Sequence, residues 1–152
     1  MSDFVDDLVA LCRYFSIFER ERVCGASVTV QQCVVLQSLL GGPREVGSLA
    51  EEVGSSPSAM TRLLDGLVRR GWADRARAEA DRRYVYVSLS TPGRREAERL
   101  RDQTAQTIEL VLGTLPEPKR GQVLESLALV RKAMEDAREA LRSCCARELR
   151  VD

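Results

Sequence analysis

Residues 46–72 read VGSLAEEVGSSPSAMTRLLDGLVRRGW and contain two short helical patterns on either side of a break. Ser48 and Glu51 have the spacing of a capping box, in which a hydroxyl and a carboxylate satisfy free amide groups at a helix start. This spacing predicts a short helix over residues 49–53. Gly54 suits the left-handed conformation that ends a helix, so a tight turn is expected there.

A second helix is predicted over residues 57–70, with Ser56 as its N-cap and Pro57 at its first helical position. Its apolar side chains recur at three- and four-residue spacing and are expected to face the core: they are Ala59, Met60, Leu63, Leu64, Leu67 and Val68. The opposite face carries Ser58, Thr61, Arg62, Asp65 and Arg69. Hydroxyls beside an arginine can donate to base edges and phosphates in a major groove. The two helices therefore predict a helix-turn-helix whose second helix reads DNA.

A β-ribbon, or wing, is predicted after the second helix. Residues 72–77 and 84–89 give two short β-rich runs around the segment AEADR at 78–82. Arginines on or near the tip would suit a narrow, electronegative minor groove: they are Arg75, Arg77, Arg82 and Arg83. Asp81 is expected to pair with a wing arginine such as Arg83 and to stabilise the ribbon.

Three segments, SLAEEV at 48–53, SAMTRLLDGLVRRGW at 58–72 and DRRYVYVSLS at 81–90, resemble the winged helix-turn-helix of MarR-family transcriptional regulators. The most specific piece is the Asp-x-Arg element followed by a β-run that ends in Leu-Ser. The resemblance extends over essentially the whole chain, because the flanking helices have the family's order and lengths. It implies a dimeric DNA-binding regulator, usually a repressor, often released by a small ligand or by thiol chemistry.

The fold class expected is mainly α with a small β-wing: a winged helix-turn-helix flanked by N- and C-terminal dimerisation helices. A chain of 152 residues has the size of one domain. We therefore expect a single MarR-like domain over 1–152, in which residues 29–91 form the DNA-binding region and residues 1–28 and 92–152 supply the dimerisation helices.

Both ends of the chain carry apolar stripes that need a partner. The first helix is expected over residues 3–23, with its stripe formed by Phe4, Leu8, Leu11, Phe15 and Phe18. A capping box at Thr29–Gln32 begins the next helix. The last helix follows Pro116 and Pro118, and its apolar residues step by alternating fours and threes: Val123, Leu127, Val130, Met134, Ala137, Leu141 and Cys144. We expect these stripes to build a homodimer interface; packing within one subunit is the alternative.

The predicted DNA contacts come from the second helix and the wing: Ser56, Ser58, Ala59, Thr61, Arg62, Arg75, Arg77, Arg82 and Arg83. The formal net charge of the chain is zero, but residues 55–83 hold seven arginines against four acids. This local excess suits double-stranded DNA. A two-fold dimer would place two recognition helices about one DNA turn apart, so a pseudo-palindromic operator is expected.

Other classes of function are disfavoured by composition. The chain has no histidine, no Gly-rich phosphate loop and no nucleophile elbow, so neither an enzyme nor a required cofactor is expected. No apolar run is long enough for a bilayer and no leader precedes the first helix, which favours a soluble, cytoplasmic protein. The rival class is a winged helix used only for protein contacts, which would lack salt-dependent binding to duplex DNA.

Five cysteines are the other distinctive feature. Cys12 lies beside the first stripe and is expected to be a small buried hydrophobe. A thiol site is predicted from Cys24, Cys33 and one cysteine of the terminal pair, Cys144 or Cys145. A thiolate cluster without imidazole prefers soft ions, such as a trivalent arsenical or another thiophilic metal ion. Three alternatives stay open: ordinary core or surface cysteines, oxidant sensing through a disulfide, and the pocket for aromatic acids that the family resemblance implies.

Overall fold

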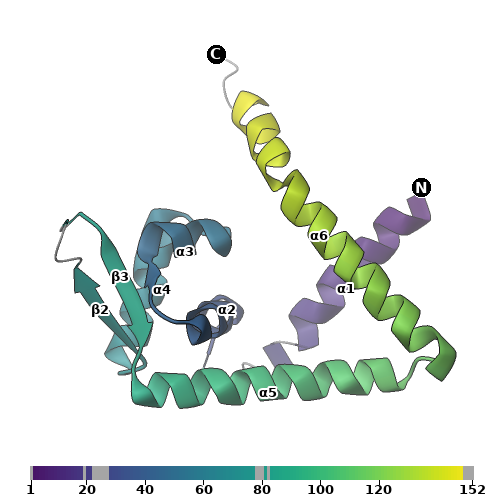
Figure 1. Cartoon of the computed structure of the whole chain (residues 1–152), viewed down its shortest axis with the longest axis horizontal. Coiled ribbons are helices and arrows are strands. Elements are labelled where there is room, and N and C mark those ends of the chain that lie inside the picture. The colour runs from purple at the N-terminus through teal and green to yellow at the C-terminus, as the bar shows by residue number, and fades with distance from the viewer. Residues whose placement is uncertain (1, 19, 22–27, 78–80, 82, 149–152) are drawn as a thin grey trace. The chain divides into compact units, whose positions relative to one another are not determined.

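A computed structural model of the chain describes residues 2–18, 20–21, 28–77, 81 and 83–148, with side chains from residue 3 to residue 138 of these ranges. The chain forms two compact units, Met1–Ile108 and Glu109–Asp152. Figure 1 shows the helices and the small sheet that make them up. None of the helices in the described part of the chain is both long and apolar enough to cross a membrane.

Apart from η2 and β1, which were not predicted, the elements follow the predicted order: α1 (Ser2–Phe18), α2 (Val30–Ser38), the 3-10 turn η2 (Leu39–Gly41), β1 (Arg44–Glu45), α3 (Val46–Glu52), α4 (Pro57–Arg69), β2 (Ala73–Arg77), β3 (Val85–Leu89), α5 (Thr91–Gly113) and α6 (Glu117–Glu148). The expected fold class, mainly α with a small β-wing, is confirmed. Helix α1 runs to Phe18, and its predicted end at residue 23 lies outside the described part of the chain, as do residue 19 and residues 22–27.

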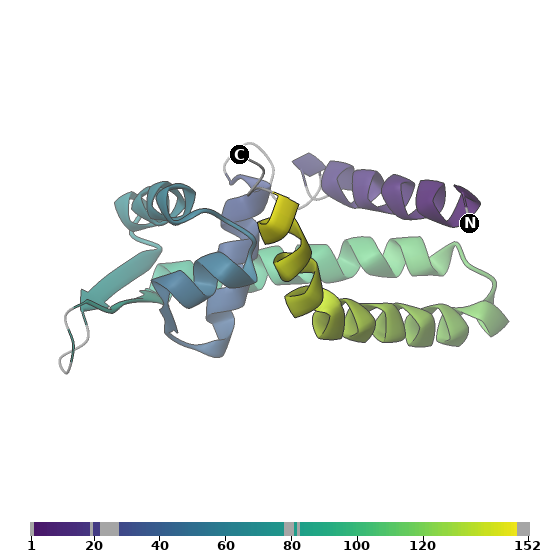
Figure 2. The ribbon, with the colours of Figure 1, turned by 90° about the horizontal axis from the view of Figure 1, so that it is seen from above.

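The sheet is antiparallel with strand order β1-β3-β2. Strands β2 and β3 pair from Ala73 opposite Leu89 to Arg77 opposite Val85, which confirms the predicted hairpin. Viewed from above, this hairpin extends away from α3 and α4 (Figure 2). The short strand β1 was not predicted; it pairs with β3 and adds a third strand at the base of the hairpin.

The core of the first unit lies between the winged-helix elements. Its buried apolar residues are Val28, Cys33, Val35, Leu36, Leu39, Leu49, Ala50, Met60, Leu64, Leu67, Ala73, Val87, Ala97 and Leu100. On α4 the buried face is narrower than predicted, because Ala59 and Leu63 are half-buried and Val68 is 39% exposed. The prediction that Val68 faces the core was wrong. The residues of α4 that are buried in the core are Met60, Leu64 and Leu67.

Helix α2 begins as predicted. The Thr29 hydroxyl accepts from the amide of Gln32 at 3.2 Å, and the Gln32 side chain accepts from the Thr29 amide at 3.2 Å. This reciprocal pair satisfies two of the free amides of the first turn. The helix also packs closely on α4, since a Cβ added at Gly66 would lie 2.8 Å from Gln32 Nε2.

The start of α3 differs from the prediction. The helix begins at Val46, and its N-cap is Glu45, whose carboxylate accepts from the amides of Gly47 at 2.8 Å and Ser48 at 2.7 Å. Glu45 is held in place by strand pairing with Tyr86. A Cβ on Gly47 would lie 3.1 Å from both carboxylate oxygens, so glycine leaves room for this cap. The predicted capping box at Ser48 was therefore wrong, because a charged acceptor three residues earlier takes the role.

The tight turn predicted at Gly54 is confirmed by backbone geometry, and a second tight turn lies at Gly71. Gly54 has φ +65° between α3 and α4, and Gly71 has φ +68° between α4 and β2. These are left-handed conformations that residues with a Cβ rarely adopt. They let α4 follow α3 directly and let β2 turn back beside α4.

The apolar residues of the terminal helices are largely exposed. On α1, Phe4 is 63% exposed and Phe15 is 43% exposed. Cys12 is also exposed, which corrects its predicted burial, whereas Leu8 and Phe18 of the stripe are half-buried. On α6, Leu127 is 50% exposed and Met134 is 55% exposed.

Candidate nucleic-acid interface

The N-terminal half of α4 presents the predicted groove-reading residues. The Ser56 hydroxyl accepts from the Ala59 amide at 3.3 Å, and the Ser56 carbonyl accepts from the Met60 amide at 2.8 Å, so Ser56 is the N-cap as predicted. Because Met60 is buried against the core, the other side of this turn faces outward. Five of the predicted DNA contacts lie here. Ala59 is half-buried, and the other four are exposed: Ser56, Ser58, Thr61 and Arg62.

The side chains on this turn differ in what they can offer a base edge. Thr61 donates its hydroxyl proton to the Pro57 carbonyl at 2.9 Å, so it presents a methyl group and an acceptor lone pair outward. The hydroxyls of Ser56 and Ser58 lie 3.3 Å apart and share one hydrogen bond. The Arg62 guanidinium has no hydrogen-bond or ion-pair partner within the described ranges, and it is the strongest free donor on this face.

Arg75 occupies a different place from the one predicted. It lies in the middle of β2, opposite Val87, and its guanidinium turns toward α4. There Nη1 donates to Asp65 Oδ1 at 2.6 Å and Nη2 donates to the Thr61 carbonyl at 3.0 Å. The prediction that Arg75 lies near the wing tip was wrong. The sequence carried a signal for this position: strand residues alternate faces, and Ala73 on the same face is buried in the core.

The wing end is stabilised by the predicted pair of Asp81 and Arg83. Arg83 Nε donates to both carboxylate oxygens at 3.1 Å, Nη2 donates to Oδ2 at 2.8 Å, and the Arg83 amide donates to Oδ1 at 3.0 Å. These hydrogen bonds from Arg83 lower the pKa of the Asp81 carboxyl and raise the pKa of the Arg83 guanidinium. The Arg83 side chain is still 88% exposed, so the pair remains accessible to an anion.

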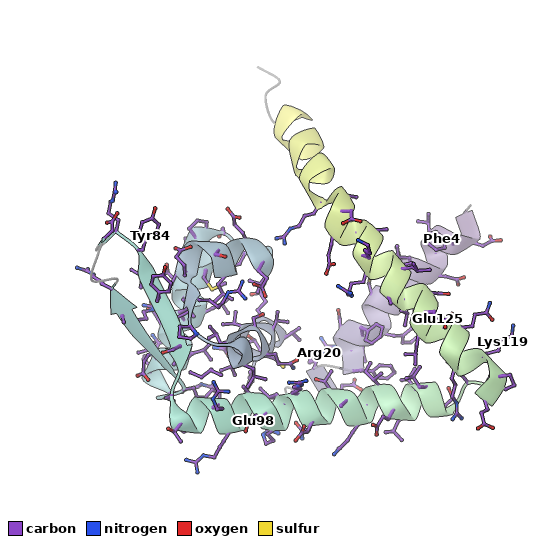
Figure 3. All side chains as sticks on the ribbon, in the orientation of Figure 1. Phe4, Arg20, Tyr84, Glu98, Lys119 and Glu125 are labelled. Carbon is purple, nitrogen blue, oxygen red and sulfur yellow. The ribbon has the colours of Figure 1, made fainter. Side chains whose placement is uncertain are left out.

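The remaining predicted wing contacts are Arg77 and Arg82. Arg77 is the last residue of β2 and is exposed, with no hydrogen-bond or ion-pair partner in the described part of the chain. Arg82 lies outside the described residues. Tyr84 stands at the same end of the hairpin (Figure 3) and is 51% exposed. The predicted set omits Arg69, an exposed cation in the last turn of α4 whose position on the polar helix face was the available signal.

The ion pairs determine which charged side chains of this surface remain without an oppositely charged partner. Two acids of the region, Asp65 and Asp81, are each paired with an arginine. Three exposed arginines, Arg62, Arg69 and Arg77, have no such partner among the residues described. The surface of α4 and the wing therefore carries free positive charge, as contacts to phosphate and to guanine require.

A second set of contacts joins the winged helix to α5. The Ser90 hydroxyl donates to the Gly71 carbonyl at 2.5 Å and accepts from the Gly93 amide at 3.1 Å. The Ser90 amide also donates to the Trp72 carbonyl at 3.1 Å. A Cβ on Gly93 would lie 1.7 Å from that carbonyl oxygen, so only glycine fits this crossing. The turn after α4, the end of β3 and the start of α5 thus meet at one junction.

The predicted thiol site is only partly within the described residues. Cys33 is fully buried in the core, and Gln37 Nε2 donates to its sulfur at 3.3 Å. Cys24 lies outside the described residues, as do the side chains of Cys144 and Cys145. Within the part of the chain that the structure describes, no group of three cysteines or acids is placed to hold a metal ion.

Comparison with known sequences agrees with this geometry. A sequence model of the MarR family matches residues 26–83, the segment from before α2 to the wing. Residues 26–83 are thus similar in sequence to the winged helix of MarR-family proteins. The chain is also similar to the uncharacterised HTH-type transcriptional regulator YfiV of Bacillus subtilis, with 31% identity over 98 residues, 64% of this chain and 61% of that protein.

Solved structures extend the likeness beyond the MarR-family winged helix to most of the chain. FabT of Streptococcus pneumoniae in complex with DNA has a TM-score of 0.76 at 18% identity, covering 89% of this chain and 97% of that one. A mutant MarR of E. coli complexed with operator DNA has a TM-score of 0.67 at 23% identity, covering 83% and 92%. At these identities the likeness establishes the fold. The chain spans about three fifths of the length of the curated regulators that it matches.

Proposed function

We propose that this chain is a homodimeric DNA-binding transcriptional regulator of the MarR family that represses by occluding a promoter. The observation that carries the proposal is the free positive charge of α4 and the wing. Arg62 and Arg77 are exposed and have no ion-pair partner among the described residues, and they lie on two adjacent elements that suit the major and the minor groove. Two proteins with the same fold, FabT of Streptococcus pneumoniae and a mutant MarR of E. coli, have been solved in complex with DNA.

The contacts proposed on α4 follow from what each side chain has left to offer. Arg62 can donate two hydrogen bonds to O6 and N7 of a guanine. Thr61 presents its methyl group and an acceptor, which suits a thymine methyl or an amino group of adenine or cytosine. Arg77, Arg82 and Arg83 would then follow the minor groove and its phosphates.

Dimerisation is supported by the exposed apolar side chains of the terminal helices. Phe4 and Phe15 on α1 and Leu127 and Met134 on α6 are each more than 40% exposed. Apolar surface of this extent on two helices of one chain is typical of a protein–protein interface. A second copy of the chain would cover it and give a two-fold reader of a pseudo-palindromic operator.

For release from DNA we propose an effector that acts at cysteine thiolates, with trivalent arsenic or another soft metal ion first to be tested. Cys33 supports a coupling to DNA binding, because it is fully buried in α2 and α2 packs on α4. Any group attached to its sulfur must displace α2, since close-packed interiors do not accommodate added volume. The alternative effectors are an oxidant that reacts with the same thiols and an aromatic ligand that binds elsewhere. With either of them the chain would still be a repressor, but a different compound would release it from DNA.

The proposal is tested by selecting binding sites from a library of randomised duplexes and measuring fluorescence anisotropy of a selected duplex. Arsenite, cumene hydroperoxide and salicylate are then added separately to the complex under matched conditions, with arsenite in reducing buffer. Release by arsenite that is lost in the Cys33→Ser variant or in a Cys144→Ser, Cys145→Ser variant supports the thiolate effector. Release by one of the other two compounds, with indifference to arsenite, replaces that effector and keeps the regulator.

A further inference from the structure

We infer that Arg75 and Asp65 form a clamp that positions the recognition helix relative to the wing, and that Arg75 contributes to DNA reading as a positioning residue without touching DNA. This inference rests on the proposed DNA-binding function. It reassigns an arginine whose place in a basic ribbon otherwise suggests a direct contact.

The clamp joins two elements that would read different grooves. The guanidinium comes from the middle of β2, while both of its acceptors belong to α4: the carboxylate of Asp65 at 2.6 Å and the main-chain carbonyl of Thr61 at 3.0 Å. The two donor nitrogens are the two ends of one planar fork. A fork with two fixed acceptors defines both the distance and the orientation between the strand and the helix.

The acceptor at Thr61 gives the clamp its relevance to specificity. Thr61 and Arg62 are the groove-facing residues proposed above, and Arg75 binds the backbone of the first of them. Side chains that contact base edges must be held by supporting residues, because a displacement of about 1 Å is enough to lose a directed hydrogen bond. The clamp therefore acts at the point of α4 where a displacement would be most costly for base readout.

The clamp also explains an acid on a surface proposed to face DNA. Asp65 on its own would repel phosphate. Its pairing with Arg75 leaves this patch without net charge, so the pair neither attracts nor repels the backbone appreciably. The side chains are 30% and 42% exposed, and both guanidinium ends are already used on α4.

The test compares binding to a selected duplex with binding to a scrambled duplex of equal length, at several salt concentrations. The variants are Asp65→Ala, Arg75→Ala, their double variant and Arg75→Lys. Asp74→Ala is the matched control for Asp65→Ala, because Asp74 lies on the opposite face of β2, is exposed and has no ion-pair partner in the described part of the chain. Arg77→Ala is the matched control for Arg75→Ala, since Arg77 is a proposed direct contact.

The ratio of specific to non-specific affinity is the readout, because a variant that loses folded protein loses both affinities in the same proportion. We expect this ratio to fall about tenfold in Asp65→Ala and Arg75→Ala, as for one lost base contact. The double variant should fall no further, since the two residues act as one pair. Arg75→Lys should also fall although it keeps the charge, because a lysine cannot form the fork. Asp74→Ala should keep the wild-type ratio.

Salt dependence separates positioning from direct contact. Arg77→Ala should reduce the salt slope by about one, as expected for a lost phosphate contact, while Arg75→Ala leaves the slope unchanged. The inference is overturned if Arg75→Ala reduces the slope as Arg77→Ala does, if Arg75→Lys binds like the wild type, or if Asp65→Ala binds more tightly. If the wild-type chain selects no duplex at all, the proposed function itself fails and the clamp has no DNA to position.

Discussion

Arg62 is the residue on which base reading by α4 depends most directly. It is exposed, and it follows Thr61, whose hydroxyl donates to the Pro57 carbonyl. No described residue forms a hydrogen bond or an ion pair with its guanidinium. Bidentate pairing of an arginine with guanine is the commonest specific contact between proteins and DNA. The acid on the same helix, Asp65, is paired with Arg75.

Replacing Arg62 by alanine should therefore weaken specific binding by about 1–3 kcal/mol and relax the preference at one base pair of each half-site. Anisotropy titrations with the selected duplex and with single-base variants of it measure both effects. Arg101→Ala is the control, because Arg101 is an exposed arginine on α5 outside the winged helix. Equal binding by the two variants would show that Arg62 does not read a base.

At the wing, the Asp81–Arg83 pair makes a prediction for pH. The hydrogen bonds from Arg83 hold the pKa of the Asp81 carboxyl below its ordinary value. The stabilisation by this pair is therefore complete above the unfolded pKa and is lost as the pH falls through the lower folded pKa. The Arg83 Nε resonance in an NMR titration should stay constant from neutral pH down to about pH 4 and shift only in more acidic solution. In Asp81→Asn that transition should be absent; a transition of the same size in both proteins would assign it to another carboxyl group.

At the scale of elements, the helix-turn-helix and the hairpin were predictable because their signals are local. Ser56-Pro57 begins α4, Gly54 and Gly71 turn the chain, and the β-forming residues of β3 provide the strand with which β2 pairs. The N-cap of α3 was not predictable in the same way. Glu45 takes that role because strand pairing with Tyr86 places it there, and a two-residue strand leaves no pattern in a sequence.

The direction of Arg75 shows the same difference between local and tertiary signals. Composition places an arginine in a basic ribbon, but its side-chain direction follows from the strand's period and from the position of α4. Likewise, the charge count over residues 55–83 includes Asp65 and Asp81 without showing that both are paired. Which arginines remain free could only be read from the packed structure.

The junction between the winged helix and α5 carries a stability prediction. Gly93→Ala would place a Cβ 1.7 Å from the Trp72 carbonyl oxygen, so the backbone must shift. We expect a loss of about 1–3 kcal/mol in the free energy of unfolding, as for overpacked sites.

Gly121→Ala is the control for this junction, because nothing lies within 4 Å of the Cβ that it adds in α6. It should stabilise the chain by about 0.5–1 kcal/mol, the usual preference for alanine over glycine inside a helix. Denaturant unfolding followed by circular dichroism gives both values. A Gly93→Ala variant as stable as the wild type would contradict the claim that only glycine fits this junction.

At the scale of the whole molecule, the proposed regulator needs two copies of the chain to read a two-fold site. The apolar residues on α6 that follow the heptad-like spacing include Leu127, whereas Leu129 lies outside that spacing and is 70% exposed. Leu127→Glu should therefore yield monomers in sedimentation velocity, and Leu129→Glu should remain dimeric. A wild-type chain that sediments as a monomer, or a Leu127→Glu variant that remains a dimer, would contradict the prediction that the apolar stripe on α6 forms the homodimer interface.

The central claim, that the surface of α4 and the wing binds duplex DNA, is tested most directly by an anisotropy titration of the wild-type chain with a selected duplex at a series of salt concentrations. The logarithm of the association constant should fall linearly with the logarithm of salt concentration, by about 0.9 for each phosphate neutralised. A scrambled duplex should bind more weakly at every salt concentration. Absence of binding, or binding that does not change with salt, would contradict the claim and favour a winged helix that contacts proteins.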